Sequence, residues 1–479
     1  TTIYIINFLA IINLIFREKR SIEATVAWVL VLTTAPAIGC ILYIAVGRGI
    51  SKNNMFKIKE AEDKILKENI IDTQIKLDRN DNFEPNLIGY KDMIYALANS
   101  NNSHFTTNND VEIFPEPNDF FESLLEELKK AKHHINIQFY IFKDDEIGNK
   151  IIDILIDKAQ NGVEVRLLYD AVGSRLFSDK SIHKLKKSGV KVGAFFPSFM
   201  KVINFNLNYR NHRKIVVIDG NVGFIGGNNI GDEYLGKDPK FGYWRDTHLK
   251  ITGDSVKDLN IRFILDWRYT TKEDLVLDKY FGNETLRLSN SKACKDIGIQ
   301  IVSSGPDSTE LDEIKYGYIK MIQKAKKYIY IQTPYFILDK TLTDTLKIAC
   351  FSGVDVRIMI PSKPDHPFVY WASSSYAGEL LKYGAKLYNY DHNAFLHAKT
   401  IVVDDCVCSI GTANMDIRSF ELNFEINAFM YSSEVAKKQR AIFENDILKS
   451  KEITLDMYNS RSRYMRLKES ISRLLSPIL

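Results

Sequence analysis

The sequence lacks a strong excess of charge of either sign. Its 64 lysines and arginines nearly balance 60 aspartates and glutamates, so the net charge is only +4 over 479 residues. Domains that bind nucleic acid usually carry a clustered basic surface. Overall charge therefore does not indicate such a function, and any basic surface on this protein must be local.

Cysteine is also scarce. The five cysteines are Cys40, Cys294, Cys350, Cys406 and Cys408, and no two of them form a Cys-x-x-Cys pair. This usage argues against a disulfide framework and against a zinc site. We expect free, buried thiols in a protein of a reducing compartment.

Two long apolar runs lie near the N-terminus, at residues 3–16 and 24–46. The second is long enough to cross a hydrocarbon core of roughly 30 Å, whereas the first falls short of it. No small-residue cleavage site separates the runs, so a membrane hairpin over residues 1–48 is favoured over a signal peptide. Pro36 and Gly39 are compatible with a transmembrane helix.

The flanks of these runs do not orient the hairpin, because lysines and arginines lie both before and after the second run. Residues 49–110 are polar and rich in Asn and Asp, and we interpret them as a connector. The remaining chain, with an apolar content of 45% overall, can form a large core.

One stretch occurs twice in this remaining chain. NHRKIVVIDGNVGFIGGNN covers residues 211–229, and LHAKTIVVDDCVCSIGTAN covers residues 396–414. Each is His-x-Lys-x-x-x-x-Asp with a later Gly-x-x-Asn; one copy is weak evidence, but two matched copies are strong evidence. His212, Lys214, Asp219, Gly226 and Asn229 correspond to His397, Lys399, Asp404, Gly411 and Asn414.

The similarity between the two halves extends upstream of these motifs. ELKKAKHHINIQFYIF (127–142) resembles MIQKAKKYIYIQTPYF (321–336), and NGVEVRLLYD (161–170) resembles SGVDVRIMIP (352–361). Helices and strands alternate, which predicts an α/β fold with a mainly parallel sheet in each half. We expect two domains related by a pseudo-twofold axis, at residues 111–285 and 286–479.

Strand geometry predicts different roles for the residues of the motif. Because side chains at i and i+2 project to one face of a strand, His212 and Lys214 share a face, as do their counterparts in the second copy. Asp219 and Asp404 complete the catalytic motifs but have the opposite parity, which favours a structural or orienting role. Asn229 and Asn414 follow a second strand and are placed to bind substrate phosphate.

The residue types point to phosphodiester chemistry. One neutral His can attack phosphorus, and a second, protonated His can donate its proton to the leaving alkoxide. Lys and Asn would stabilise the equatorial oxygens. Each His needs a carboxylate to orient it, and the candidates are Asp246 in WRDTH and Glu425 in NFEIN, which follow the histidine of the same half.

Several other polar residues have ordinary structural interpretations. Gln138 and Gln332 lie in the repeated strands, where a structural and a catalytic role are equally plausible. His104, His133, His134 and His183 are expected at the surface, whereas His248, His366 and His392 lie close enough to the motifs to stay open.

Nearly the whole chain resembles the phospholipase D superfamily, and most closely the bacterial cardiolipin synthases. The resemblance rests on WVLVLTTAPAIGCILYIAVGR, RNHRKIVVIDG, WRDTH, IVSSGPD, PSKPDHPFVYWASSSY and NMDIRSFELNFE. It implies two α-β-α sandwich domains and transfer of a phosphatidyl group between two phosphatidylglycerol molecules, giving cardiolipin and glycerol. His212 would be the nucleophile and His397 the acid and base.

The resemblance further implies no metal and no cofactor, and a multi-pass protein whose catalytic domains face the cytoplasm at the plasma membrane. The near-neutral charge and the apolar hairpin argue against a nucleic-acid partner. Two alternatives stay open. The same site could use water as acceptor, as a phospholipase D-type hydrolase does, or the chain could be a non-enzymatic scaffold. The basic amphipathic segment 459–479 either lies on an anionic membrane or packs on the body.

Overall fold

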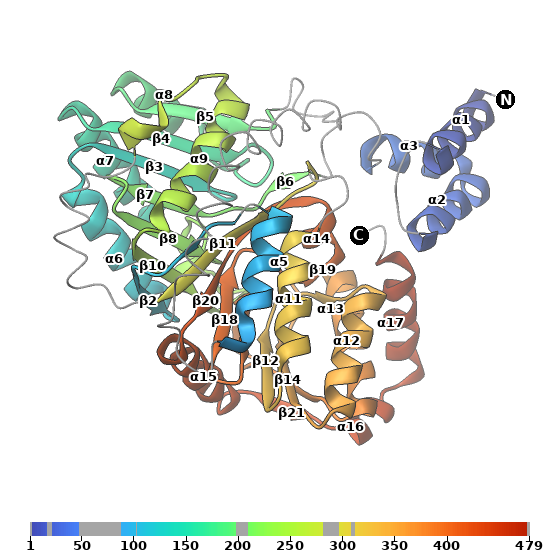
Figure 1. The fold of residues 1–479 in the computed structure, drawn as a ribbon. Coiled ribbons are helices and arrows are strands. Elements are labelled where there is room, and N and C mark those ends of the chain that lie inside the picture. The colour runs from blue at the N-terminus through green and yellow to red at the C-terminus, as the bar shows by residue number, and fades with distance from the viewer. Residues whose placement is uncertain are drawn as a thin grey trace.

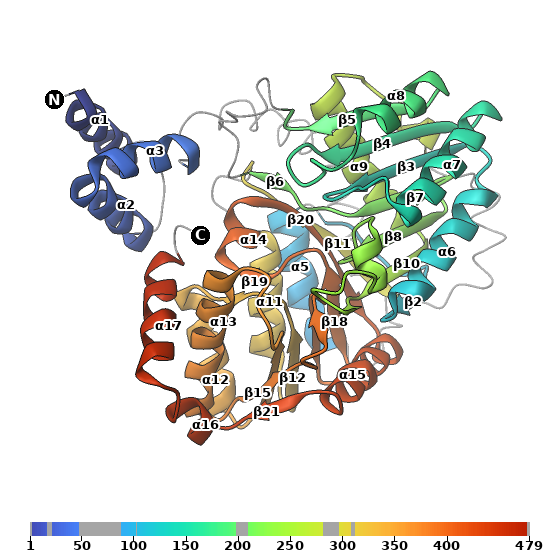
Figure 2. The same ribbon diagram turned by 180° about the vertical axis from the view of Figure 1, so that it is seen from behind.

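The computed structural model describes residues 2–16, 22–46, 88–101, 103–197, 209–280, 297–307 and 312–476. These residues form three N-terminal helices and a body of two α/β halves, each built on one large sheet (Figures 1 and 2).

The first half contains a seven-stranded sheet with the order β2-β10-β8-β7-β3-β4-β5. Helices α6, α7 and α8 cover one face and α9 covers the other, since their apolar residues enter separate cores. The strands are β2 (Asn109–Phe114), β3 (His134–Phe139), β4 (Glu164–Asp170), β5 (Lys191–Phe195), β7 (Ile215–Ile218), β8 (Val222–Gly226) and β10 (His248–Gly253); the helices are α6 (Pro117–Lys130), α7 (Glu146–Gln160), α8 (Asp179–Lys187) and α9 (Val256–Thr271).

Helix α7 follows directly from its sequence. Ile147, Ile151 and Leu155 recur every four residues and are buried on one face. Asp145 caps the first turn by accepting a hydrogen bond from the N–H of Gly148. Gly162, with a φ of 88°, then turns the chain into the next strand.

The second half contains the larger sheet, in the order β1-β11-β20-β18-β17-β12-β14-β15-β21. Helices α5, α11, α12 and α13 share one core, while α15 packs on the opposite face. The strands are β1 (Phe105–Thr106), β11 (Gly298–Ser304), β12 (Tyr328–Gln332), β14 (Asp355–Ile360), β15 (Lys386–Asn389), β17 (Thr400–Val403), β18 (Val407–Gly411), β20 (Asn423–Tyr431) and β21 (Lys451–Ile453); the helices are α5 (Lys91–Asn101), α11 (Glu313–Lys324), α12 (Lys340–Phe351), α13 (Pro367–Leu380), α14 (Ile417–Glu421), α15 (Ser433–Ile447), α16 (Leu455–Asn459) and α17 (Arg463–Leu475).

A single apolar core joins the halves. Phe263 and Trp267 of α9 lie in the same cluster as Val435 and Phe443 of α15, together with residues of both sheets. Separating the halves would expose this surface to water at a cost of roughly 25 cal/mol per Å². We infer that the halves fold as one unit, which fixes the strand ends of one half relative to those of the other.

The expectation of mainly parallel sheets is wrong. In the first sheet only β3–β4 and β4–β5 are parallel, and the other neighbours run antiparallel. The motif strand β7 is joined to β8 by a tight turn at Asp219 and Gly220, both with positive φ. A hairpin of this kind needs no crossover helix, so the strands after each histidine motif are antiparallel. The second half repeats this arrangement.

Part of the predicted connector (49–110) is ordered and belongs to the second half. Helix α5 packs on α11, and β1 pairs with β11. The chain therefore contributes to the second sheet before it builds the first. Residues 47–87 and the predicted boundary at 285–286 lie outside the described residues.

The N-terminal apolar runs form three helices, α1 (Thr2–Phe16), α2 (Ile22–Thr34) and α3 (Pro36–Val46). The second run is interrupted at Ala35, because Pro36 disfavours helical geometry in the residue before it. Within the part of the chain that the structure describes, no helix has the length and apolarity to cross a membrane.

Asp219 and Asp404 bind backbone N–H groups at the turns after the motif strands, which supports the structural role predicted for them. The Asp219 carboxylate accepts hydrogen bonds from the backbone N–H groups of residues 132–134, at 2.8–2.9 Å. Asp404 accepts from residues 326–328, at 2.6–2.9 Å. Each carboxylate thus ties the turn after the motif strand to the start of the neighbouring strand, β3 or β12.

We expect Asp219→Ala to lower the free energy of unfolding by about 1–3 kcal/mol, because it leaves backbone donors without acceptors. Activity per folded molecule should change little. Chemical denaturation and activity of the same preparations measure both quantities. Asp153→Ala, which removes an exposed ion pair with Lys184, is the control and should change stability by less than about 0.5 kcal/mol. Full stability with abolished activity would instead make Asp219 catalytic.

Candidate active site

A cavity of about 560 Å³ lies where the two halves meet, and both motif histidines line it. Its walls come from loops that follow the strands of both sheets, so neither half encloses it alone. The first half contributes Tyr140, Arg175, Arg210, His212, Asn229 and Trp244, and the second contributes Tyr335, Asp365, His366, His397, Asn414, Asp416 and Arg418.

Each histidine is attached to a strand of the other half. β6 (Arg210–Asn211) pairs in parallel with β20, and the N–H of His212 donates to the Phe424 carbonyl at 2.9 Å. β16 (Ala394–Leu396) pairs with β9 (Tyr243–Arg245), and the N–H of His397 donates to the Arg245 carbonyl at 2.7 Å. The short strand before each histidine is therefore exchanged, in the sense that it pairs with a strand of the other half.

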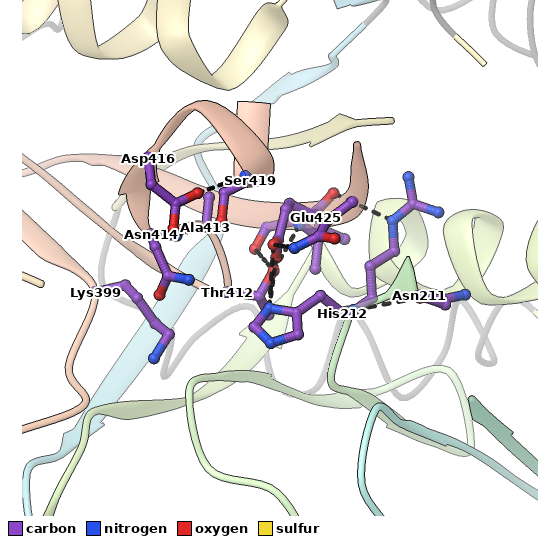
Figure 3. Close-up of polar contacts among 12 residues, drawn as sticks. Asn211, His212, Lys399, Thr412, Ala413, Asn414, Asp416, Ser419 and Glu425 are labelled. Carbon is purple, nitrogen blue, oxygen red and sulfur yellow. Dashed lines mark hydrogen bonds and ion pairs between the residues drawn. The ribbon is translucent and has the colours of Figure 1, made fainter. Parts of the chain in front are cut away.

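Because of this exchange, each histidine contacts the carboxylate of the other half. His212 Nδ1 lies 3.1 Å from Glu425 Oε1, whereas His397 Nδ1 lies 2.6 Å from Asp246 Oδ2. Figure 3 shows the imidazole of His212 directed at Glu425. The sequence identified the two carboxylates, but the expected pairing within each half is wrong. The reason is that β9 and β20, which precede or contain them, align with the other half's motif.

The carboxylates determine which ring nitrogen faces the cavity. Asp246 and Glu425 are fully buried, which by itself would raise the pKa of each. The charge of Lys399 outweighs burial at Asp246, and the contact with the His212 imidazole followed by the charge of Lys214 outweighs it at Glu425, so both pKa values are lowered and both groups are ionised. An ionised carboxylate at Nδ1 keeps a proton there and leaves Nε2 available for reaction.

The motif lysines lie directly beside their histidines. Lys214 Nζ donates to the His212 carbonyl at 2.7 Å, and Lys399 Nζ donates to the His397 carbonyl and lies 2.7 Å from its Nδ1. Burial lowers the pKa of Lys214 to about 7 and that of Lys399 to about 8. Their charge therefore depends on pH near neutrality.

Burial keeps both histidines neutral near pH 7. Burial, followed by the charge of Lys399, lowers the pKa of His397 to about 4. Burial also lowers the pKa of His212, against the opposing effect of Glu425. A bound phosphodiester anion would favour the protonated form of one of them.

The two motif asparagines reach the cavity, as the sequence predicted. The side chain of Asn229 is held by the N–H of Ile141 and the hydroxyl of Tyr234, each at 3.1 Å. Asn414 is buried, and among the described residues no hydrogen-bond partner meets its Oδ1. This oxygen thus remains available to accept a hydrogen bond from a ligand.

Gln138 and Gln332 are structural. Their amides donate to Asp266 at 2.8 Å and to Asp446 at 2.7 Å. Both aspartates also bind an arginine adjacent to a site residue, namely Arg213 next to His212 and Arg245 next to Asp246.

These arginines were missed at the level of sequence, although RNHRK and WRDTH contain them. Arg213 Nε donates to the Glu425 carbonyl at 3.1 Å while its Nη1 binds Asp266 at 2.8 Å. Arg213 thus anchors the Glu425 backbone to the first half. An arginine beside a functional residue was the available signal in the sequence. The aspartates that bind these arginines lie on α9 and α15, too far along the chain to be linked to them by a motif.

The remaining histidines do not all lie where the sequence predicted. His134 is buried in β3, so its expected surface position is wrong, and burial lowers its pKa to about 4. His248 stacks on Phe120 at 3.9 Å between ring centroids and is buried away from the cavity. His366 lines the cavity, and His392 is exposed. None of the described residues forms a cluster of acidic, histidine or cysteine side chains suited to a metal ion.

Two α/β halves that each contribute one His-x-Lys motif to a shared cavity define a protein of the phospholipase D superfamily. The solved structure of phosphatidylserine synthase from Haemophilus influenzae has the same fold, with a TM-score of 0.61 and 17% identity over 81% of this chain and 100% of that one. A family model for "Cardiolipin synthase, PLD-like domain" matches residues 124–239 and 318–447, and one for "Phospholipase_D-nuclease N-terminal" matches residues 5–48.

Curated relatives narrow the family further. The chain is 47% identical to the cardiolipin synthase of Oceanobacillus iheyensis and 48% identical to the major cardiolipin synthase ClsA of Bacillus subtilis. Each comparison covers 99% of this chain and 98% of the relative. The chain belongs to the cardiolipin synthase family.

The crossed pairing predicts which histidine each carboxylate affects. In Glu425→Gln the pKa of His212 should fall, because the opposing negative charge is removed, while that of His397 should stay unchanged. Asp246→Asn should have the reverse effect. The pH dependence of diethyl pyrocarbonate modification, followed by mass spectrometry at each histidine, measures both. A shift at His397 in Glu425→Gln would contradict the crossing.

The lysine pKa values predict a decline of kcat/KM at alkaline pH. Lys214 and Lys399 lose their positive charge above about pH 7–8, and the anionic substrate then binds a less positive site. The rate at low substrate should fall by up to about tenfold per pH unit above the pKa. Initial rates from pH 6 to 9 at constant ionic strength test this. A rate that rises over this range would show that lysine charge does not assist the reaction.

Proposed function

We propose that this protein is a cardiolipin synthase that uses phosphatidylglycerol as both donor and acceptor. The observation that supports it best is the pair of histidines on one cavity, each paired with a buried carboxylate. Two histidines are what a double displacement at phosphorus requires: one bonded to phosphorus and one to transfer the proton.

In the first step, Nε2 of His212 attacks the phosphorus of a donor phosphatidylglycerol. The bond between phosphorus and the glycerol head-group oxygen breaks, and His397 donates its proton to that oxygen. Glycerol leaves, and a phosphatidyl group remains on His212. Lys214, Lys399 and Asn414 stabilise the charge on the phosphoryl oxygens during this transfer.

In the second step, neutral His397 removes the proton from a head-group hydroxyl of a second phosphatidylglycerol. The resulting oxygen attacks the phosphorus of the phosphatidyl-histidine, the phosphorus–nitrogen bond breaks, and cardiolipin forms. The proton returns to His397, so the site regains its starting state.

A lipid acceptor carries a second phosphate, which needs a second positive region in the cavity. Arg175, Arg210 and Arg418 line the cavity in addition to the motif residues. Guanidinium groups bind phosphate through paired hydrogen bonds. Water as acceptor would have no use for them, which favours transfer to lipid over hydrolysis.

We place the enzyme at the plasma membrane with its catalytic halves on the cytoplasmic side. The N-terminal helices contribute large exposed apolar side chains, among them Tyr4, Phe8, Phe16, Ile22 and Ile41. Such a surface is stable in lipid rather than in water, and it would keep the cavity near its substrate.

Incubation of the purified protein with phosphatidylglycerol alone tests the reaction. We expect cardiolipin and free glycerol in equal amounts, measured by lipid mass spectrometry and an enzymatic glycerol assay. His212→Ala and His397→Ala should each reduce turnover by at least about 10³-fold. Phosphatidic acid as the main product would identify the protein as a hydrolase.

A further inference from the structure

Helix α17 packs on the body with its polar side. It lies along α13, and its Glu469 and Ser472 are buried in this contact. Arg473 forms an ion pair with Glu379 at 2.6 Å, and the Lys468 ammonium lies 4.6 Å from the ring centre of Trp371. Charged groups therefore hold this helix to the protein.

The apolar side of α17 faces outward. Tyr464, Leu467, Ile471 and Leu474 follow one another at intervals of three and four residues, which places them in one stripe. Their side chains are 67%, 55%, 44% and 75% exposed. A surface helix of a soluble protein normally has the opposite orientation, with its apolar stripe toward the core. This stripe therefore requires a partner outside the described body.

The C-terminal end of α17, which carries the stripe, lies beside the catalytic cavity. Ser476, directly after α17, lines the cavity, and so does Val369 of the adjacent helix α13. Phe368, the neighbour of Val369, is exposed, and across the cavity Leu176 is exposed beside Arg175. Apolar side chains thus flank the cavity on both halves.

The charges around the stripe indicate the partner. Arg463 and Arg466 are exposed on either side of Tyr464, and Lys468 and Arg473 are partly exposed. An apolar stripe edged by basic residues suits the interface of an anionic bilayer, where apolar groups enter the acyl region and cations meet lipid phosphates. The C-terminal end of α17 also points to the side of the body on which α1–α3 lie (Figures 1 and 2).

We propose that the α17 stripe, with Phe368 and Leu176, docks the body on the surface of an anionic bilayer and holds the cavity entrance at the lipid head groups. This surface acts in addition to the N-terminal helices. It rests on the proposed function in one respect, namely that the cavity takes a lipid.

The first experiment compares two physical forms of the same substrate in the full-length enzyme. Leu467→Glu/Leu474→Glu should reduce cardiolipin formation on phosphatidylglycerol vesicles by at least about tenfold, since two charged groups would have to enter the interface. Its rate on water-dispersed short-chain phosphatidylglycerol should equal that of the wild type. The control is Ile348→Glu/Phe351→Glu, which changes two equally exposed residues at the end of α12 remote from the cavity and should affect neither rate.

An equal loss on both substrates would mean that α17 is merely structural, and an unchanged rate on vesicles would mean that it does not dock; either result overturns the proposal. A wild-type rate on vesicles that accompanies a change from dimer to monomer in the variant would assign the stripe to a second copy of the chain.

A second measurement does not depend on catalysis. Leu474→Trp should show a blue-shifted emission on phosphatidylglycerol vesicles, with quenching by brominated acyl chains, whereas Ile348→Trp should show neither. Absence of quenching at residue 474 overturns the docking surface. Failure of the wild type to make cardiolipin, with quenching retained, overturns only the proposed reaction.

Discussion

Two hydrogen bonds that cross between the halves, from His212 to Glu425 and from His397 to Asp246, are the contacts on which the rest of the site depends. Each joins an imidazole from one half to a fully buried carboxylate of the other. Both halves must therefore be folded and docked before either histidine is oriented. The shared apolar core around α9 and α15 provides that docking.

The crossing also explains how so many charges are buried at one place. A buried carboxylate or ammonium is costly unless it is paired. Here the carboxylates face the histidines and lysines, and behind them Arg213 and Arg245 bind Asp266 and Asp446. Burial is not fully offset at Lys214 and Lys399, because their pKa values fall to about 7 and about 8. A phosphodiester anion would complete the balance, so substrate fits the site electrostatically.

Apolar and charged groups are also segregated at the surface of the protein. The N-terminal helices and the α17 stripe expose runs of apolar side chains, whereas the body has a large buried apolar core. An enzyme whose substrates have acyl chains and whose chemistry takes place at a phosphate needs both properties. The cavity joins them, because charged residues line it and apolar residues surround its entrance.

The sequence by itself determined the features that depend on near neighbours or on repetition. The position of Asp219 at the end of the motif strand indicated a structural role, and the duplicated motif established two halves. The expected placement of His212 and Lys214 on a strand is wrong, because both lie between β6 and β7. Asp246 and Glu425 were also identifiable, as carboxylates beside the motifs. Only the tertiary structure decided which carboxylate meets which histidine, that residues 88–106 join the second half, and that α17 turns its apolar stripe outward. The physical reason is that pairing between strands some two hundred residues apart, and the docking face of a helix, depend on the packing of the whole chain, on which local periodicity has no influence.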